Sequence, residues 1–483
     1  MAAHEPQLDR DVEKFSTRPN TVVNDLPSPS SSWSDTDSPD PTNFCKWKKI
    51  HIVIAGFTCT FNGNLGSSMP SGALDALAEH FNVSNHSHLV LLNSLYMVGY
   101  VLGPLLFAPL SECIGRRPVL VGTFLGYILF MLACSAAPTY PALLVFRLLC
   151  GVNAAAPTSV IGGLYADIID DPSVRGNAIA FYMTVTTFGP YIGPIISGFS
   201  SPMGWRWPFW IATYAPVLHN TMVRKNMKKN GGTLHNQEAL RPFDLRRIFL
   251  RPVTLLFTEP IVLCTSAYLT LVYSVMYLMF QAYPIIFQDF YGLSPGMASL
   301  AYIPLCVGVL IAFGAFLFFT WHRDRQAAAG KPWANKEIYR RLPLACIASP
   351  CMVVSLFWLG WTVWDSVPPI VPMIGGIFFP AGMQLLFMGM INYLTDVFRQ
   401  SSASAHAAAS WTRSTGAILL PLAAEPMYRN LGLHWAPSVL GFLALLMGAI
   451  PFVFLKYGER LARGTKAGEE AYGVHTESTA HET

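Results

Sequence analysis

The chain has 483 residues, of which 52% are hydrophobic and only 12% are charged, and its formal net charge is +4. A soluble enzyme of this length would carry about twice that share of charged residues, so the composition argues against one and favours a protein embedded in a lipid bilayer. The small positive charge does not indicate a nucleic-acid partner, because lysine and arginine gather in a few short segments.

Residues 1–44 are rich in serine, proline, aspartate and asparagine, a composition that predicts a disordered cytoplasmic tail. A bilayer core requires about 20 apolar residues per helix, and eleven runs of that kind follow. We therefore predict an all-α polytopic membrane protein. The runs lie at residues 50–70, 89–111, 119–137, 142–166, 177–199, 260–285, 296–320, 342–363, 369–395, 403–424 and 433–455.

Basic residues between the runs predict the orientation of the chain, because cytoplasmic connections collect lysine and arginine. Arg116 and Arg117 follow the second run and Arg175 follows the fourth. The connections at residues 71–88 and 286–295 contain acidic residues but no lysine or arginine. Both termini are therefore expected in the cytoplasm, and the plasma membrane is the expected location.

The first outside connection carries two acceptor triplets for glycosylation, which begin at Asn82 and Asn85. Such triplets also arise by chance, so the sequence leaves their use open. A glycan at either site would agree with the outside placement of this connection.

The alternation between basic connections inside and connections without lysine or arginine outside fails in the middle of the chain. The fifth run should end outside, yet residues 224–251 hold eight lysine and arginine residues, the strongest inside signal in the sequence. Only residues 205–223 lie between, and their longest charge-free apolar stretch is too short for a bilayer, so we predict that the sixth span is truncated or missing. The predicted organisation is a tail at 1–44, an N-terminal bundle of five spans plus a remnant at 45–223, a basic linker at 224–256, a six-span C-terminal bundle at 257–456 and a cytoplasmic tail at 457–483.

The segment between the second and third runs, residues 108–118, carries the first motif. It resembles the signature loop of the major facilitator superfamily, Gly-x-Leu-x-Asp-Arg-x-Gly-Arg-Arg. A glycine there permits a tight turn, an acid can face a helix N-terminus, and the arginines can pair with an acid at the inner end of the fourth span. Such contacts would latch an inner gate in one state; the alternative is a basic turn without that role. The candidate gating residues are Glu112, Gly115, Arg116, Arg117 and Asp167.

Arg147 lies about six residues inside the fourth run, without a charged neighbour nearby in the sequence. An unpaired guanidinium inside a membrane costs about 2.5 kcal/mol or more, so we expect it to face a wet cavity or a partner, or else to reach the membrane surface. The match to Arg-x-x-x-Gly resembles a family position associated with proton coupling.

The fifth run contains Gly189, Gly193, Pro194 and Gly198. This spacing resembles the Gly-x-x-x-Gly-Pro-x-x-Gly-Gly motif of the antiporter branch of the superfamily. Small residues four apart let helices approach closely, and proline bends a helix by removing a backbone donor. We expect this face to seal a leak path while the two halves of the protein rock.

Similar segments continue through the second half of the chain, at residues 257–260, 281–284, 392–396 and 413–416. Together with the three motifs they resemble fungal members of the twelve-span drug:proton antiporter group, in the branch of polyamine and multidrug exporters. The resemblance implies a fold of two pseudo-symmetric helix bundles, without enzymatic activity, cofactor or metal, and a monomer. It also implies that about one helix has been lost near span six, through a misplaced splice junction or decay of the gene.

The resemblance implies a secondary transporter that exports small organic compounds, such as drugs, toxins or fungal secondary metabolites, in exchange for protons. The alternatives are a polyamine exporter of the same family and a non-functional product that lacks span six. Candidates for proton coupling are Arg147, Asp396 and Arg413. Candidates for the substrate cavity, expected near the bilayer midplane, are Asn62, Asn64, Gln281, Tyr283 and Trp411, for each of which bonding between helices is the alternative.

Overall fold

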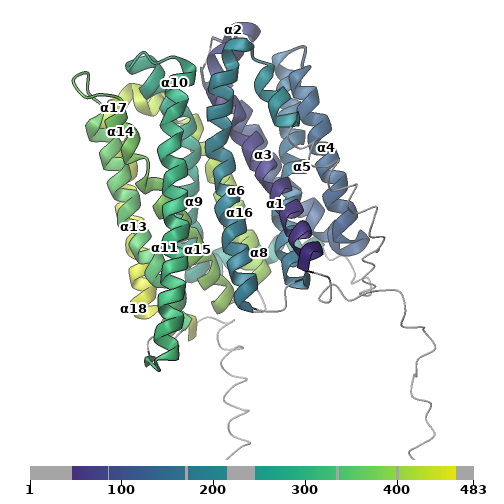
Figure 1. Cartoon of the computed structure of the whole chain (residues 1–483), viewed down its shortest axis with the longest axis vertical. Helices are drawn as coiled ribbons and strands as arrows, with labels where there is room; N and C mark the ends of the chain where they lie inside the picture. Colours follow the sequence, from purple (N-terminus) through teal and green to yellow (C-terminus); the bar gives the residue numbers. More distant parts are fainter. Residues whose placement is uncertain are drawn as a thin grey trace, which may run out of the picture. The chain divides into compact units, whose positions relative to one another are not determined.

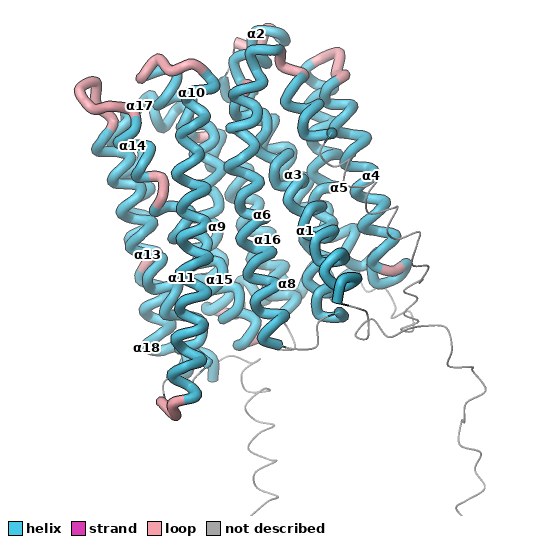
Figure 2. Tube along the Cα trace, viewed as in Figure 1, coloured by secondary structure: helices cyan, strands magenta, loops and turns pink. Residues whose placement is uncertain are grey.

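The computed structural model describes residues 46–84, 86–168, 172–214, 245–332, 337–398 and 402–463. Everything below concerns these described residues. All regular structure in the described ranges is helical (Figures 1 and 2). The predicted tail at 1–44 and most of the tail at 457–483 lie outside these ranges.

The N-terminal group of helices precedes the gap after residue 214. Its last helical residues, 207–214, come shortly after the fifth predicted span and lead into that gap. The rest of the segment 205–223 lies outside the described residues, so a truncated or missing sixth span stays a prediction. The elements of this group are α1 (Lys46–Ser68), η2 (Met69–Gly72), α2 (Leu74–Phe81), α3 (His86–Ile114), α4 (Arg116–Ser135), α5 (Tyr140–Ile168), α6 (Pro172–Ser200) and η3 (Ser201–Met203).

The C-terminal group begins inside the predicted basic linker, where α8 forms a helix. Its elements are α8 (Leu245–Thr258), α9 (Pro260–Tyr283), the π-helix η4 (Pro284–Phe290), α10 (Pro295–Ser299), η5 (Leu300–Tyr302), α11 (Ile303–Ala328), α13 (Glu337–Thr362), α14 (Ile370–Gly375), α15 (Phe378–Val397), α16 (Ser402–Leu422), α17 (Ala424–Met447) and α18 (Ala449–Arg463).

Nine helical segments of the described residues are long and apolar enough to cross a membrane. The two remaining predicted runs, 50–70 and 403–424, are the helices α1 and α16, with 23 and 21 residues. They are less apolar because they carry buried or half-buried polar side chains, among them Asn62, Ser410 and Arg413. The prediction of an all-α polytopic membrane protein is therefore confirmed.

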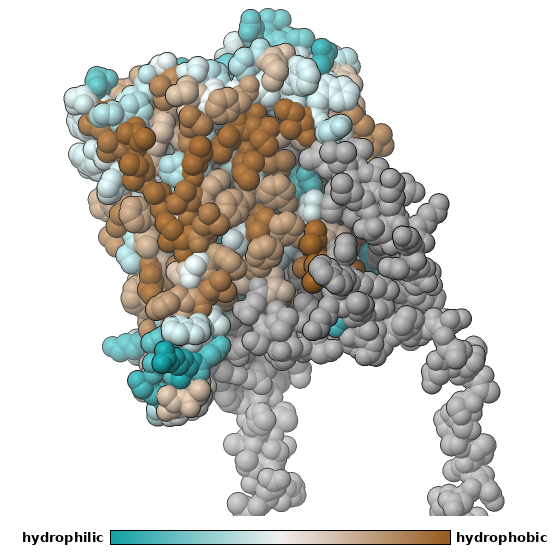
Figure 3. All heavy atoms as spheres, viewed as in Figure 1, coloured by the Kyte–Doolittle hydropathy of each residue, from teal (hydrophilic) through white to brown (hydrophobic). Residues whose placement is uncertain are grey.

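The outer surface of the helices is apolar. Figure 3 shows a broad hydrophobic belt over α11, α13 and α6, with hydrophilic residues gathered towards the two ends of the helices. Large side chains on this surface are well exposed, for example Leu310 at 57%, Phe318 at 65% and Leu446 at 70%. Apolar area of this extent would be unfavourable in water, so the belt is the surface that contacts lipid.

The two ends of the helix array differ, and we refer to them by one helix each. The α2 end, uppermost in Figure 1, holds η2, α2, η3 and α10. The opposite α8 end holds α8, the turn between α3 and α4, and the last turn of α11. Helix α1 begins and helix α18 ends at the α8 end, so both ends of the described chain lie on one side (Figure 1).

The N-terminal and C-terminal groups meet along what we call the central seam, where α3 packs against α16 and α6 packs against α11 and α10. Several hydrogen bonds cross it, among them one between α3 and α16 and one between α9 and α1. The hydroxyl of Ser94 donates to the carbonyl of Ile418 over 3.1 Å, and that of Tyr277 donates to Ser67 Oγ over 3.0 Å. The seam therefore joins the halves through polar contacts as well as apolar packing.

Candidate functional site

The seam is tightly closed at the α2 end, where the predicted antiporter motif lies. Gly189 and Gly193 on α6 pack against α1, since a Cβ on Gly189 would lie 2.9 Å from the Cβ of Asn64. Gly198 contacts the other half, because a Cβ there would lie 2.6 Å from the Cβ of Ser299 and 2.7 Å from the carbonyl oxygen of Pro295. Only glycine permits this approach of the two backbones.

Burial differs between individual residues of the seam. Tyr191, Phe280 and Gln281 are no more than 1% exposed. Tyr273 and Arg413, deeper towards the α8 end, are half-buried. The halves are therefore in close contact at the α2 end, and Tyr273 and Arg413 are less completely buried than Tyr191, Phe280 and Gln281.

Arg413 lies on α16, on the C-terminal side of the seam. Its Nη2 donates to Ser410 Oγ over 3.2 Å, and its guanidinium carbon lies 5.2 Å from the ring centre of Tyr273 and 5.4 Å from that of Phe387. Its Nε is buried without an acceptor. It is also close enough to the hydroxyl of Tyr277 for an electrostatic interaction.

Arg147 on α5 has a different environment, because it is fully buried and its donors are used by backbone. Its Nε donates to the carbonyl of Leu92 over 3.0 Å, its Nη1 to Gly66 over 2.7 Å and its Nη2 to Ser67 over 3.0 Å. The ring of Tyr96 lies 4.4 Å from the guanidinium carbon. Arg147 thus caps the last carbonyls of α1, where a helix favours positive charge.

Arg147 and Arg413 are connected through α1 and α9. Arg147 donates a hydrogen bond to the backbone carbonyl of Ser67, and the side-chain hydroxyl of Ser67 accepts a hydrogen bond from Tyr277. The ring of Tyr277 lies 5.2 Å from that of Tyr273, which in turn lies against Arg413. The two predicted coupling residues therefore belong to one chain of contacts across the seam.

The predicted cavity residues fall into two groups. Both side-chain amide atoms of Asn64 are hydrogen-bonded, since Nδ2 donates to the carbonyl of Thr186 over 3.0 Å and Oδ1 accepts from the hydroxyl of Tyr100 over 2.9 Å. Asn62 donates within its own helix. In contrast, both amide atoms of Gln281 and the hydroxyl of Tyr283 are buried without a hydrogen-bond partner.

The gating loop is described only in part. Gly115 has a φ of +91° and forms the predicted turn between α3 and α4, with Arg116 half-buried beside it. Trp411 is half-buried on α16, and Asn82 is exposed at the end of α2 with a φ of 53°. The structure does not describe Asn85 or the side chains of Glu112, Arg117, Asp167 and Asp396.

Three seam contacts were not predicted from the sequence: the pair Tyr277 and Ser67, the aromatic rings around Arg413, and a bond between α6 and α15. In the last, Thr187 Oγ1 donates to Gln384 Oε1 over 2.8 Å. A sequence signal exists for α9, since Tyr273, Tyr277 and Gln281 recur every four residues and so share one helix face.

The hydrogen bond between Thr187 and Gln384 predicts a moderate effect. Replacing Thr187 by valine should weaken this conformation by about 1 kcal/mol, or roughly fivefold in the equilibrium between states. Maleimide labelling of a cysteine introduced at Ser410, which is half-buried here, should slow accordingly. Thr362→Val, on an exposed hydroxyl bonded within its own helix, is the control; equal labelling rates in both variants would contradict the prediction.

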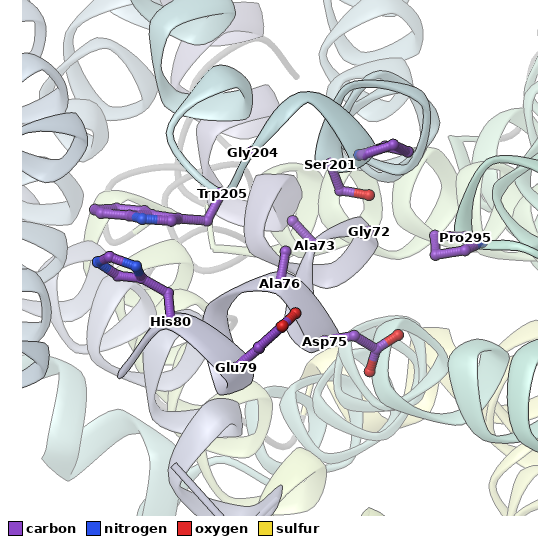
Figure 4. Close-up of a pocket in the computed structure, with 11 residues that line it drawn as sticks. Gly72, Ala73, Asp75, Ala76, Glu79, His80, Ser201, Gly204, Trp205 and Pro295 are labelled. Atoms are coloured by element: carbon purple, nitrogen blue, oxygen red, sulfur yellow. The ribbon is translucent and has the colours of Figure 1, made fainter. Parts of the chain in front are cut away.

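A depression of about 750 Å³ opens at the α2 end, between α2, η3 and α10. Figure 4 shows Asp75 and Glu79 of α2 on one side of it and His80 next to Trp205, with a ring distance of 4.9 Å. The lining includes Gly72, where an added Cβ would lie 2.6 Å from the backbone nitrogen of Gly198, and Pro295 of α10. The depression therefore lies beside the contact between Gly198 and α10.

Residues 56–421 match the family model described as Major Facilitator Superfamily. The chain belongs to the major facilitator superfamily. It is 34% identical over 457 residues to the MFS-type transporter traF of Penicillium crustosum, covering 91% of this chain and 93% of that one. It is 36% identical over 453 residues to the efflux pump FUBT of Fusarium oxysporum, covering 89% of this chain and 76% of the pump.

Solved structures agree with this assignment. The superfamily proton:xylose symporter XylE, bound to 6-bromo-6-deoxy-D-glucose, aligns with a TM-score of 0.61 at 16% identity, over 85% of this chain and 97% of that one. At this identity the likeness shows the fold alone. The predicted major facilitator fold is thus confirmed, and the chain is a multi-pass membrane protein of a superfamily whose relatives here are named as fungal transporters and efflux pumps.

Proposed function

We propose that this member of the major facilitator superfamily exports small organic compounds across the plasma membrane, in exchange for protons, by alternating access. The observation that carries the proposal is the close contact of the two halves at Gly198, at the α2 end of the central seam, with the half-buried Arg413 further along the seam. A transporter of this kind opens its midplane site to one side at a time. The names of the relatives, efflux pumps among them, support the direction of transport.

The orientation follows from the positive-inside rule. Arg323, Arg325 and Lys331 lie at the end of α11, which is at the α8 end (Figure 1). We assign this end to the cytoplasm together with both termini, so the conformation described here faces inward. The depression beside Asp75 and Glu79 is then the outer mouth of the pathway.

The predicted gating residues, Glu112, Gly115, Arg116, Arg117 and Asp167, would close the α8 end in the opposite state. Opening of the α2 end would then require α6 and α10 to part at Gly198. In this scheme protonation of an acid such as Asp396 would change the electrostatic environment of Arg413. Through Tyr277 and Ser67, the change would also reach Arg147. The contacts between these last residues are short and continuous.

The test of export uses a pump-deficient yeast strain that expresses the full chain. Lower accumulation of labelled lipophilic compounds than in cells with an empty vector, abolished by a protonophore, is the expected result. Accumulation above the vector level would show an uptake permease instead. No difference with any compound would support the non-functional alternative, and protection against spermidine alone would support the polyamine alternative.

A further inference from the structure

Arg413 and Arg147 both lie deep among the helices, but only one of them is satisfied by the protein. Arg147 donates to three backbone carbonyls. Arg413 donates to one neutral hydroxyl, that of Ser410, and its buried Nε has no acceptor. Within the described part of the chain it forms no ion pair. A buried guanidinium N–H without an acceptor is unfavourable, so a ligand that brings an acceptor to Nε would be stabilised there.

The surroundings of Arg413 define what that ligand can be. The rings of Tyr273 and Phe387 lie 6.1 Å apart, and both are near the guanidinium. They supply apolar surface and leave the edge that contains Nε without an acceptor. That edge of a guanidinium binds carboxylates with two parallel hydrogen bonds, while aromatic faces suit a planar apolar group. The complementary ligand therefore carries a carboxylate on an apolar or aromatic body.

A second polar contact is available further along α9. Gln281 follows Tyr273 by eight residues, a rise of about 12 Å along the helix, and Tyr277 lies between them on the same face. Both amide atoms of Gln281 are buried without partners. An amide can donate or accept, so it would pair with a hydroxyl, ketone or amide at the far end of the ligand.

We propose that Arg413 binds the carboxylate of an organic anion, and that the exported compounds therefore include weak organic acids. This proposal rests on the proposed export function and names its substrate class. A polycation would be repelled by the unpaired guanidinium. A role of Arg413 as the proton carrier is unfavourable as well, because a guanidinium keeps its proton in proteins.

The test measures equilibrium binding to the purified full-length chain in detergent, and so does not depend on transport. The probes are radiolabelled 2-naphthoate and 2-naphthamide, which share one ring system and differ in charge. The wild-type chain should bind the naphthoate at least tenfold more tightly. In Arg413→Gln the preference for the naphthoate should vanish, while the affinity for the amide changes less than about twofold. Arg413→Lys should retain part of the preference for the naphthoate.

The matched control is Arg429→Gln, since the side chain of Arg429 is 79% exposed and pairs with Glu425; its preference should equal that of the wild type. If Arg413→Gln does not fold, the pH dependence of binding to the wild-type chain tests the proposal. As the pH is lowered and 2-naphthoate is protonated, its affinity should fall, whereas the affinity for 2-naphthamide should not change. Equal binding of the two probes, no naphthoate binding, or a preference that survives in Arg413→Gln would overturn the proposal. If the chain exports neutral compounds but shows no preference for the naphthoate over the amide, the proposed substrate class is wrong and the proposed export function still holds.

Discussion

Replacing Arg147 by methionine should abolish both transport and the folded state of the protein. The substitution leaves three buried carbonyls, of Leu92, Gly66 and Ser67, without their donors. Each such group costs roughly 1–3 kcal/mol, and the sum approaches the total stability of a typical protein. The side chain is 0% exposed, so water cannot take its place. Size-exclusion chromatography of a fluorescent fusion should show the loss of the monodisperse peak.

Two further variants separate charge from geometry at this position. Arg147→Lys keeps the charge but cannot reach three carbonyls from one ammonium, so we expect an intermediate yield and a lowered melting temperature. Arg429→Met, at the exposed position 429, should behave as the wild type. A monodisperse and active Arg147→Met protein would show that the three carbonyl contacts are dispensable.

Replacing Gly198 by leucine should stop export while leaving the yield of folded protein nearly unchanged. The new side chain would overlap Ser299 and the carbonyl of Pro295, so α6 and α10 could not close the α2 end. We expect export to fall at least tenfold. Ser71, which is 2% exposed, should become reactive to a membrane-impermeant maleimide once replaced by cysteine in this background.

Gly314→Leu provides the matched control, because a Cβ on Gly314 of α11 meets no atom within 4 Å. It adds the same volume on the same type of helix without touching the seam. Wild-type export by Gly198→Leu, together with an unreactive cysteine at position 71, would mean that the contact at Gly198 is not the outer seal.

The helices could be predicted well from the sequence and the contacts between them could not. Hydropathy and loop charge suffice for the spans, because lipid imposes a simple requirement on every residue that faces it. Helices α1 and α16 show the limit of that signal, since the side chains that matter at the seam lower their hydropathy. The turn at Gly115 was also predictable, because only glycine adopts its φ of +91° without strain.

The partners of the polar residues were less accessible to sequence reasoning. Arg147 was expected to face water, an acid or the membrane surface, but it donates to backbone carbonyls at the end of α1, about 80 residues earlier. No residue type marks such acceptors in a sequence. Likewise, Asn64 was a candidate for substrate contact and proves to bond α1 to α3 and α6, which only the helix packing reveals.

The change from α-helix to π-helix at Pro284 would limit the length of an organic anion bound along α9 as proposed above. A π-turn shifts the register of the side chains, so the face that presents Tyr273, Tyr277 and Gln281 does not continue beyond η4 (Pro284–Phe290). The stretch of this face from Tyr273 to Gln281 is about 12 Å long. Among phenyl-substituted alkanoic acids of increasing chain length, export should decline sharply once the extended molecule exceeds that length, so α9 acts as a molecular ruler.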